Sequence, residues 1–268
     1  FLDLLVSTLK LGYHYIKGVC QVPYFITVFN NNLAGQVVIL DNTDYLVGVI
    51  TDGNLRRGLE HNYDFLTLKP DDVMTKNPLT VRPDAQLPKA ARIMLENKIT
   101  ALPVLEKDNL VGILTNSDFL RFIIEEYPTL KKPIYVNSYM TDEVVTVEKE
   151  TTLLEAHRLM GVKRIRSLPV VDDDTLAGIV TRTDLMSSDP SRLASFQKQD
   201  LSLKVLTQPV EKVMSKPLYT ISPDAELPEA AKLMLENKVH CLPVMKDNEL
   251  VGIITESDLF LMIVQKFF

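Results

Sequence analysis

A hydroxyl residue stands three positions ahead of a carboxylate at the end of three related stretches of this chain, each opened by a glycine and a short apolar run. The pairs are Thr115 with Asp118, Thr181 with Asp184, and Thr255 with Asp258. A threonine at a strand end, just before a helix, places its hydroxyl beside free backbone amides, which suits an anion such as phosphate. A carboxylate in the first helical turn can accept two hydrogen bonds from the cis hydroxyls of a ribose, and such charge-assisted bonds are about twice as strong as neutral ones.

The same spacing has a purely structural interpretation, in which the threonine caps the helix and the aspartate favours the helix dipole. Repetition does not separate the two interpretations, because a repeated fold also repeats its caps. A weaker copy runs from Thr51 to Asn54 and has an amide in place of the carboxylate. The amide can still bond a ribose hydroxyl but without charge assistance. We therefore expect this copy to be empty or weak as a site, unless Arg56 and Arg57 contribute.

The recurring stretches end repeats of one longer unit. Residues 82–118 align with residues 222–258 without a gap, and residues 140–184 form a third, more diverged copy. The second and fourth copies agree better with each other than with the third. This pattern indicates an ancestral pair that was duplicated.

Each unit has the same predicted order of elements. A turn led by methionine, as at Met74, precedes a short strand at residues 79–81, and a helix opens at Pro83. Two strands joined by a polar hairpin at residues 106–109 follow, and a second helix begins at Ser117. The order is β-α-β-β-α, so the fold class is α/β. One copy cannot bury both faces of its sheet, so neighbouring copies should pack sheet to sheet.

We predict four units in the chain. Their bounds are residues 1–66, 67–130, 131–190 and 203–268. The first is degenerate or incomplete, because only its second half is visible as two apolar strands around a polar turn. Its lead turn and its first strand cannot be identified from the sequence.

The composition excludes several classes of protein. A net charge of -6 over 268 residues argues against a broad nucleic-acid-binding face. Cys20 and Cys241 are few and far apart, which favours a reducing cytoplasm over a disulfide framework. The apolar stretch at residues 2–16 is too interrupted by polar and charged side chains to span a membrane. A His/Cys cluster with metal spacing, a Gly-x-Ser-x-Gly motif and a phosphate loop are all missing, so we expect neither a metal nor an enzyme.

These features resemble the CBS domain, which is named after cystathionine β-synthase. The resemblance rests on the Met-Thr lead, the Leu-Pro-Val strand and the closing Gly-h-h-Thr-x-x-Asp stretch, where h is apolar. Together they cover most of residues 68–268. The resemblance implies that copies pair into Bateman modules, that two modules in one chain can form a disc, and that adenine nucleotides or related adenosyl ligands bind between paired copies.

The resemblance also implies roles for two further positions. The position lining the adenine pocket falls at Leu79, Val145 and Tyr219, and the position whose basic residue reaches phosphate falls at Thr100, Arg166 and His240. Tyr219 has the shape to stack on a purine, or to serve as a partly buried sheet aromatic. Arg166 matches phosphate best, with a solvated run of charge as the alternative, whereas His240 contributes charge only when protonated.

The function implied by the resemblance is that of a non-enzymatic regulatory protein. It would need no cofactor, bind AMP, ADP, ATP or another adenosyl ligand, and signal to a protein partner through a conformational change. We expect it to be cytoplasmic, and to be a monomeric disc or a homodimer. Two alternatives remain open: a constitutive interaction scaffold without ligand, and the regulatory region of a larger enzyme or transporter.

Overall fold

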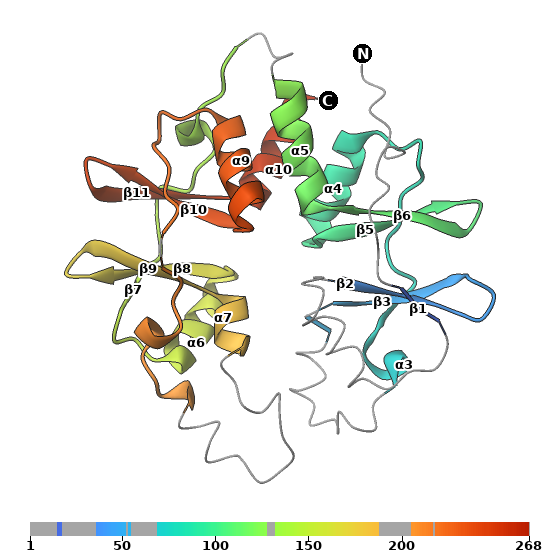
Figure 1. Ribbon diagram of the computed structural model, residues 1–268, viewed down its shortest axis with the longest axis horizontal. Helices are drawn as coiled ribbons and strands as arrows, with labels where there is room; N and C mark the ends of the chain where they lie inside the picture. The colour runs from blue at the N-terminus through green and yellow to red at the C-terminus, as the bar shows by residue number, and fades with distance from the viewer. Residues whose placement is uncertain are drawn as a thin grey trace. The chain divides into compact units, whose positions relative to one another are not determined.

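A computed structural model describes the chain over residues 15–17, 36–51, 53–54, 69–127, 132–187, 205–216 and 218–267. The chain divides into two compact units (Figure 1). Unit 1 comprises Phe1–Phe119 with Phe260–Phe268, and unit 2 comprises Leu120–Leu259. Most of the predicted first copy, and residues 191–202 between the predicted third and fourth copies, lie outside the described residues.

Unit 1 holds the described part of the first copy and nearly all of the second. Its elements are β1 (Tyr15–Lys17), β2 (Gln36–Leu40), β3 (Leu46–Thr51), α3 (Pro70–Val73), β4 (Thr75–Lys76), α4 (Leu87–Asn97), β5 (Ala101–Glu106), β6 (Asn109–Thr115) and the start of α5 (Asn116–Glu126). Strands β1 to β4 form one sheet in that order, with β1 parallel to β2 and the other neighbours antiparallel. The hairpin β5–β6 forms the second sheet.

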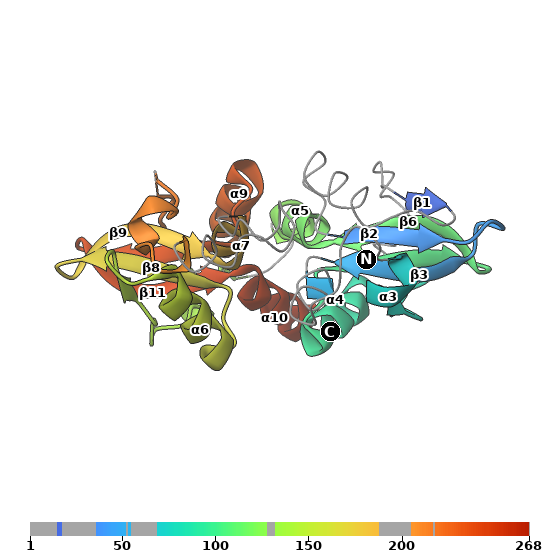
Figure 2. The same ribbon diagram turned by 90° about the horizontal axis from the view of Figure 1, so that it is seen from below.

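Unit 2 holds the third and fourth copies. Its elements are η3 (Val136–Ser138), β7 (Val147–Glu148), α6 (Leu153–Lys163), β8 (Ser167–Asp172), β9 (Thr175–Thr181), α7 (Arg182–Ser187), η5 (Val210–Lys212), α9 (Leu227–Asn237), β10 (Cys241–Lys246), β11 (Glu249–Thr255) and the start of α10 (Glu256–Lys266). Strand β7 runs parallel to β8, and each hairpin is antiparallel. Helices α6 and α9 lie on opposite sides of the strands of this unit (Figure 2).

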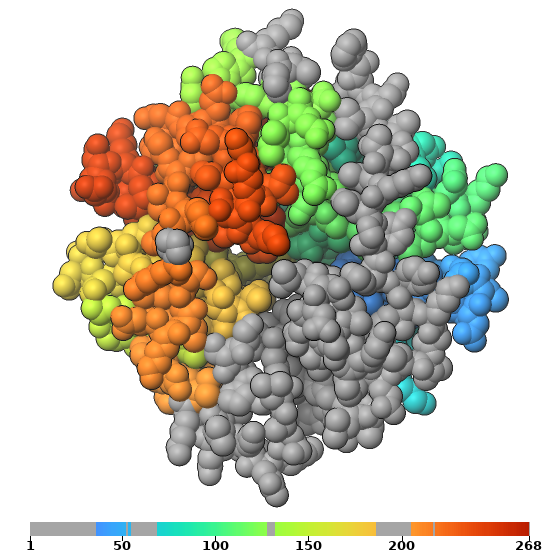
Figure 3. Space-filling model, viewed as in Figure 1, coloured from blue at the N-terminus to red at the C-terminus, as the bar shows by residue number. Residues whose placement is uncertain are grey.

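The predicted α/β fold of repeated β-α-β-β-α copies is confirmed, and so is the packing of neighbouring copies. In unit 1, Leu110 and Ile113 of β6 pack against the buried core of β2 and β3. In unit 2, β9 of the third copy contacts β11 of the fourth. The tips of the two hairpins lie side by side at the surface of this unit (Figure 3).

The hairpins confirm the predicted polar turns. In each of the three Leu-Pro-containing hairpins the two central residues have positive φ: Lys107 and Asp108, Asp173 and Asp174, Asp247 and Asn248. Two such residues are the requirement of a type I′ turn, whose twist matches that of the flanking strands. The acidic run at residues 172–174 is therefore a hairpin turn.

Two expected boundaries are wrong. The helix of the second copy begins at Leu87, because Gln86 is its extended N-cap and the Pro83 region forms a turn in which the Ala85 amide donates to the Arg82 carbonyl. The strand expected at residues 79–81 is reduced to a single parallel bridge between Val81 and Val104. The equivalent bridge in the fourth copy joins Ile221 and Val244.

The first strand of the first copy, which the sequence concealed, is β1. It runs parallel to β2 as β7 runs parallel to β8. It begins at Tyr15, well before the region in which the repeat pattern can be recognised in the sequence.

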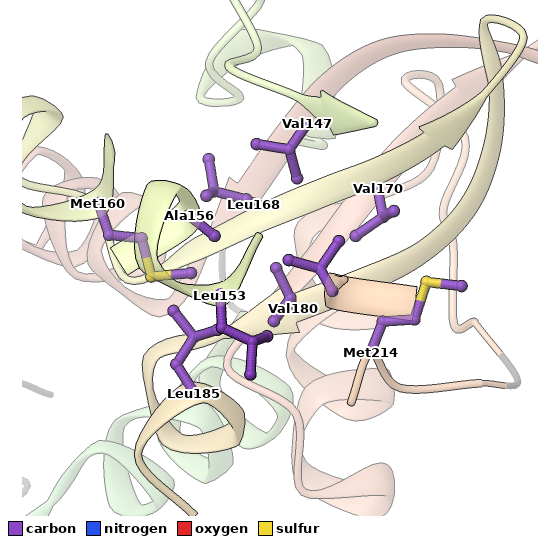
Figure 4. Packing of buried hydrophobic residues seen from close by; sticks show 10 residues of the cluster. Val147, Leu153, Ala156, Met160, Leu168, Val170, Val180, Leu185 and Met214 are labelled. Atoms are coloured by element: carbon purple, nitrogen blue, oxygen red, sulfur yellow. The ribbon is translucent and has the colours of Figure 1, made fainter. Parts of the chain in front are cut away.

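Each methionine lead packs on the partner copy instead of on its own. Thr141 pairs with Ile253 of the fourth copy, and Ser215 pairs with Ile179 of the third, so the exchange in unit 2 is reciprocal. In unit 1, β4 pairs with β3 in the same manner. The core of the third copy consequently includes Met214 from the fourth (Figure 4).

Candidate functional site

Each Thr-x-x-Asp pair forms a helix cap at the junction of a hairpin and the following helix. The backbone amide and the Oγ1 of the threonine both donate to Oδ2 of the aspartate. The distances are 2.7 and 2.8 Å for Thr115 and Asp118, 2.8 and 2.7 Å for Thr181 and Asp184, and 2.7 Å for both bonds of Thr255 and Asp258. These bonds give the motif a structural use, and in the third copy the Asp184 amide also donates to the Thr181 hydroxyl at 3.3 Å, as expected for an N-cap. The second carboxylate oxygen lies outside the two bonds from the threonine.

The three aspartates differ in burial. Asp118 is buried, whereas Asp184 and Asp258 are half-buried. Burial raises the pKa of Asp258, and the two hydrogen bonds from Thr255 offset part of that rise. The carboxylates of the third and fourth copies are therefore the more accessible pair.

In the first copy the side-chain amide of Asn54, which replaces the aspartate of the motif, has a structural role. Asn54 is 4% exposed and its Oδ1 accepts from the Thr51 amide and hydroxyl at 2.9 and 2.6 Å. Its Nδ2 donates to the Val73 carbonyl at 2.9 Å and to the Thr75 hydroxyl at 3.0 Å. An aspartate cannot donate these last two bonds. Arg56 and Arg57 lie outside the described residues.

The predicted basic positions come directly before the hairpins. The amide of the first residue of the next helix donates to their carbonyl groups: Asn116 to Thr100 at 3.2 Å, Arg182 to Arg166 at 2.8 Å, and Glu256 to His240 at 3.1 Å. Arg166 and His240 are exposed. The hydrogen bond to Glu256 raises the pKa of His240, and the charge of Arg166 opposes this rise, so charges of the third and fourth copies act on each other here.

Glu256 is a residue of this region that the sequence did not single out. Its Oε1 lies 3.1 Å from Nδ1 of His240, and its side chain is 11% exposed against 77% for the histidine. The hydrogen bond to Glu256 raises the pKa of His240. The sequence feature that could have pointed to Glu256 is its position. It immediately follows Thr255, and the hairpin places that end of β11 opposite His240.

A second contact between the two copies lies beside this region. Cys241, the first residue of β10, is a buried free thiol that shares a hydrogen bond with Ser167, the first residue of β8. Burial raises the pKa of this thiol, and the negative charges of Glu256 and Asp184 add to the rise. Side chains from both copies therefore converge within unit 2.

The three positions expected to line an adenine pocket are not equivalent. Leu79 and Tyr219 are exposed large side chains, at 47% and 40%. Val145 is partly buried and packs against the core of the third copy. Tyr219 is thus the more accessible side chain, whereas Val145 packs against the core of the third copy.

Within the described ranges, every helix is too short or too polar to cross a membrane. Among the same residues, no group of three or more His, Cys, Asp and Glu side chains is arranged to hold a metal ion.

Comparison with known proteins gives the same repeat structure. The family model of the CBS domain matches residues 71–125, 136–190 and 210–265. An uncharacterized 33.4 kDa protein of the ribosomal RNA operon of Thermofilum pendens is 31% identical over 238 residues, which are 84% of this chain and 75% of that protein. Inosine-5′-monophosphate dehydrogenase of Aquifex aeolicus is 38% identical over 121 residues, which are 44% of this chain but 24% of the enzyme.

Protein MJ1225 of Methanocaldococcus jannaschii is 26% identical over 233 residues, covering 85% of this chain and 82% of its own length. Its crystal structure, proposed to be that of an archaeal homolog of g-AMPK, superposes with a TM-score of 0.78 at 20% identity and covers 96% of this chain and 98% of that one. At this identity the likeness shows the fold.

Proposed function

Because the chain belongs to the CBS domain family, we propose that it is a non-enzymatic regulatory protein whose unit 2 binds an adenine nucleotide or another adenosyl ligand. The ligand binds where the third and fourth copies meet. It takes its ribose on Asp184 or Asp258, and binding is signalled to a partner protein.

The observation that carries this proposal is the one-sided use of Asp258 in its cap. Both bonds from Thr255 end on Oδ2 of Asp258, which leaves Oδ1 for a ligand. A ribose diol that donates to this oxygen forms charge-assisted bonds without breaking the cap. The structural and the functional interpretations of the motif are thus compatible.

Other residues of unit 2 have the chemistry that the rest of a nucleotide needs. Arg166 and His240 are exposed and their charges act on each other, and a guanidinium matches phosphate oxygens in a fork. Tyr219 offers a ring face for the base. The second copy keeps Thr115 and Asp118 but has Thr100 at the basic position, so we rank its site below those of unit 2, with Leu79 as its base-lining residue.

Regulation requires that the ligand bind one arrangement of the paired copies more tightly than another, since it can shift an equilibrium only by its differential affinity. The reciprocal exchange of leads in unit 2 links the two copies, so a change at the ligand is transmitted to both. We propose that a partner protein reads this change.

The experiment that tests the proposal is titration calorimetry of the wild type, Asp184→Asn and Asp258→Asn with AMP, ADP, ATP and S-adenosylmethionine. Asn54 demonstrates that an amide oxygen accepts both cap bonds in this fold. Asparagine should therefore preserve the cap while removing charge assistance. We expect affinity to fall about tenfold at the site whose aspartate is changed, the difference between a charge-assisted and a neutral bond.

A matched control is Asp224→Asn, whose exposed side chain precedes α9 in the same unit. It should bind as the wild type does. Absence of heat with all four ligands would favour the constitutive scaffold, and a stable co-purifying partner would support that alternative. Affinity that is indifferent to both aspartates would place the ligand elsewhere.

Further parts of the proposal concern the whole protein. We propose that residues 1–66 are the first, degenerate copy, and that the other three copies span residues 67–130, 131–190 and 203–268, which gives two Bateman modules. A cytoplasmic location is supported by the free thiol of Cys241. Sedimentation of the full chain decides between monomer and homodimer, and the full gene product decides whether the chain regulates a larger enzyme or transporter.

A further inference from the structure

We infer that Glu256 is a positioning residue, which holds His240 in its cationic form and turns the Nε2–H of the imidazole outward toward the phosphate of the ligand. This inference rests on the proposed function, because it assigns a specific task within the same site.

The backbone sets the two residues opposite each other. In the hairpin β10–β11, Cys241 pairs with Thr255. The Glu256 amide donates to the His240 carbonyl at 3.1 Å, which continues the pairing by one residue beyond the strands. Opposed residues of an antiparallel pair have neighbouring side chains on one face. The contact between the two side chains thus follows from the register.

The contact determines which nitrogen faces outward. Oε1 of Glu256 lies 3.1 Å from Nδ1, and this carboxylate is nearly enclosed whereas the ring is 77% exposed. A protonated imidazole has two N–H donors, so Nε2–H is the one left after Glu256 has taken Nδ1–H. The exposed edge of the ring then carries a charged donor of the kind that phosphate oxygens accept most strongly.

Glu256 is also what keeps the imidazole charged. The charged groups that act on His240 are Glu256, which raises its pKa, and Arg166, which lowers it. Partial desolvation lowers it as well. Without the carboxylate the remaining influences all favour neutral imidazole, which has lost the charge that a phosphate requires.

The other copies provide an internal comparison. Arg166 with Arg182 and Thr100 with Asn116 hold the same positions and share the same backbone hydrogen bond. An arginine is cationic at any ordinary pH and needs no support, and a threonine has no charge to preserve. Among these three described pairs, the carboxylate occurs beside the one basic residue that titrates near neutrality.

The test is calorimetry with AMP and with adenosine between pH 6 and 8.5 on the wild type, Glu256→Gln and, as a matched control, the exposed Glu249→Gln. Glutamine keeps the shape of the side chain but not its charge. At pH 7.5 we expect Glu256→Gln to weaken AMP binding about tenfold, the loss of one charge-assisted bond. The difference should become smaller as the pH is lowered toward 6, because His240 of Glu256→Gln then becomes protonated to a larger extent. Adenosine, which has no phosphate, should bind both proteins equally.

Proton NMR titration of His240, assigned with His240→Gln, measures the same effect without ligand. The midpoint should fall in Glu256→Gln and stay unchanged in Glu249→Gln. A midpoint unaffected by Glu256→Gln, or an AMP affinity lost equally at every pH, overturns the inference. If wild-type protein binds none of AMP, ADP, ATP, S-adenosylmethionine and adenosine, the proposed function fails instead, and the NMR midpoint still decides whether Glu256 charges the histidine.

Discussion

The residue at the end of the Thr-x-x-Asp motif accepts the two cap bonds in every described copy. The copies differ in which of its other side-chain atoms remain for further hydrogen bonds. Asp258 accepts both cap bonds, from the amide and the hydroxyl of Thr255, on one oxygen. Asn54 accepts the same two bonds on its oxygen and uses its nitrogen to hold the lead of the second copy through Val73 and Thr75. The difference between Asp and Asn at this position is therefore a difference in stability as well as in charge.

Replacing Asn54 with Asp would complete the motif in the first copy, but we expect it to destabilise the fold. The carboxylate cannot donate to the Val73 carbonyl and would face it at the 2.9 Å now occupied by a hydrogen bond. A buried polar group that loses its partner costs about 1–3 kcal/mol. Chemical denaturation of Asn54→Asp should show a loss of that size.

Asn109→Asp is the control for this change, because Asn109 is exposed and its only described side-chain bond is a long one, at 3.5 Å. Its effect should stay within about 0.5 kcal/mol. If Asn54→Asp were as stable as the wild type, the amide bonds to Val73 and Thr75 would not be contributing to stability.

Some features of single residues could be predicted from the sequence and others could not. The caps and the accessible Arg166 were predictable, because their signals are local in the chain. Glu256 was not, since its importance depends on the register of β10 and β11 and on the exposure of His240. No spacing rule connects residues 16 positions apart until the hairpin is aligned.

At the scale of elements, the glycine and methionine motifs prove to be two halves of one contact. A Cβ added at Gly48 would lie 2.5 Å from Sδ of Met74, at Gly178 2.3 Å from Met214, and at Gly252 2.7 Å from Met140. Each methionine belongs to the partner of the copy that carries the glycine. Both motifs are visible in the sequence, where each glycine and each methionine is naturally placed in its own copy. The exchange between copies cannot be seen there, because it does not change the spacing of the two motifs along the chain.

Gly178→Ala tests this contact. Met214 is buried, and its Cβ would also lie 3.2 Å from the added methyl group, so the side chain cannot simply rotate away. Overpacking of this kind typically costs about 1–3 kcal/mol. We expect thermal unfolding of Gly178→Ala to be shifted downward accordingly.

Gly161→Ala is the matched control in the same copy. It lies in α6, where an added Cβ meets nothing within 4 Å. Alanine should stabilise the protein here by about 0.5–1 kcal/mol, because glycine loses more backbone entropy in a helix. A Gly178→Ala protein as stable as Gly161→Ala would contradict the close packing of Met214.

For the whole molecule, the pairing of copies was predictable and much of the first copy was not. One copy has too little apolar surface to cover its own sheet, so a partner was required by physics as well as by resemblance. Strand β1 has three residues and is joined to β2 through 18 intervening positions, which gives no periodicity to detect. The reciprocal leads could be found only from the strand pairing.

Ligand binding should consequently stabilise unit 2 more than unit 1. A ligand at about 100 times its dissociation constant raises the free energy of unfolding by about 2.7 kcal/mol. For amides that exchange only when the binding region unfolds, this corresponds to roughly a 100-fold slowing of hydrogen exchange. Hydrogen exchange with saturating AMP should show this slowing in β8 to β11, and less of it in β2 and β3. Asp184→Asn and Asp258→Asn together should reduce the slowing to roughly tenfold at the same AMP concentration, because a tenfold loss of affinity leaves AMP at about ten times its dissociation constant. Equal protection of β2 and β3 would mean that the AMP site is not confined to unit 2, and that the second copy, with Thr115 and Asp118, also takes part in binding.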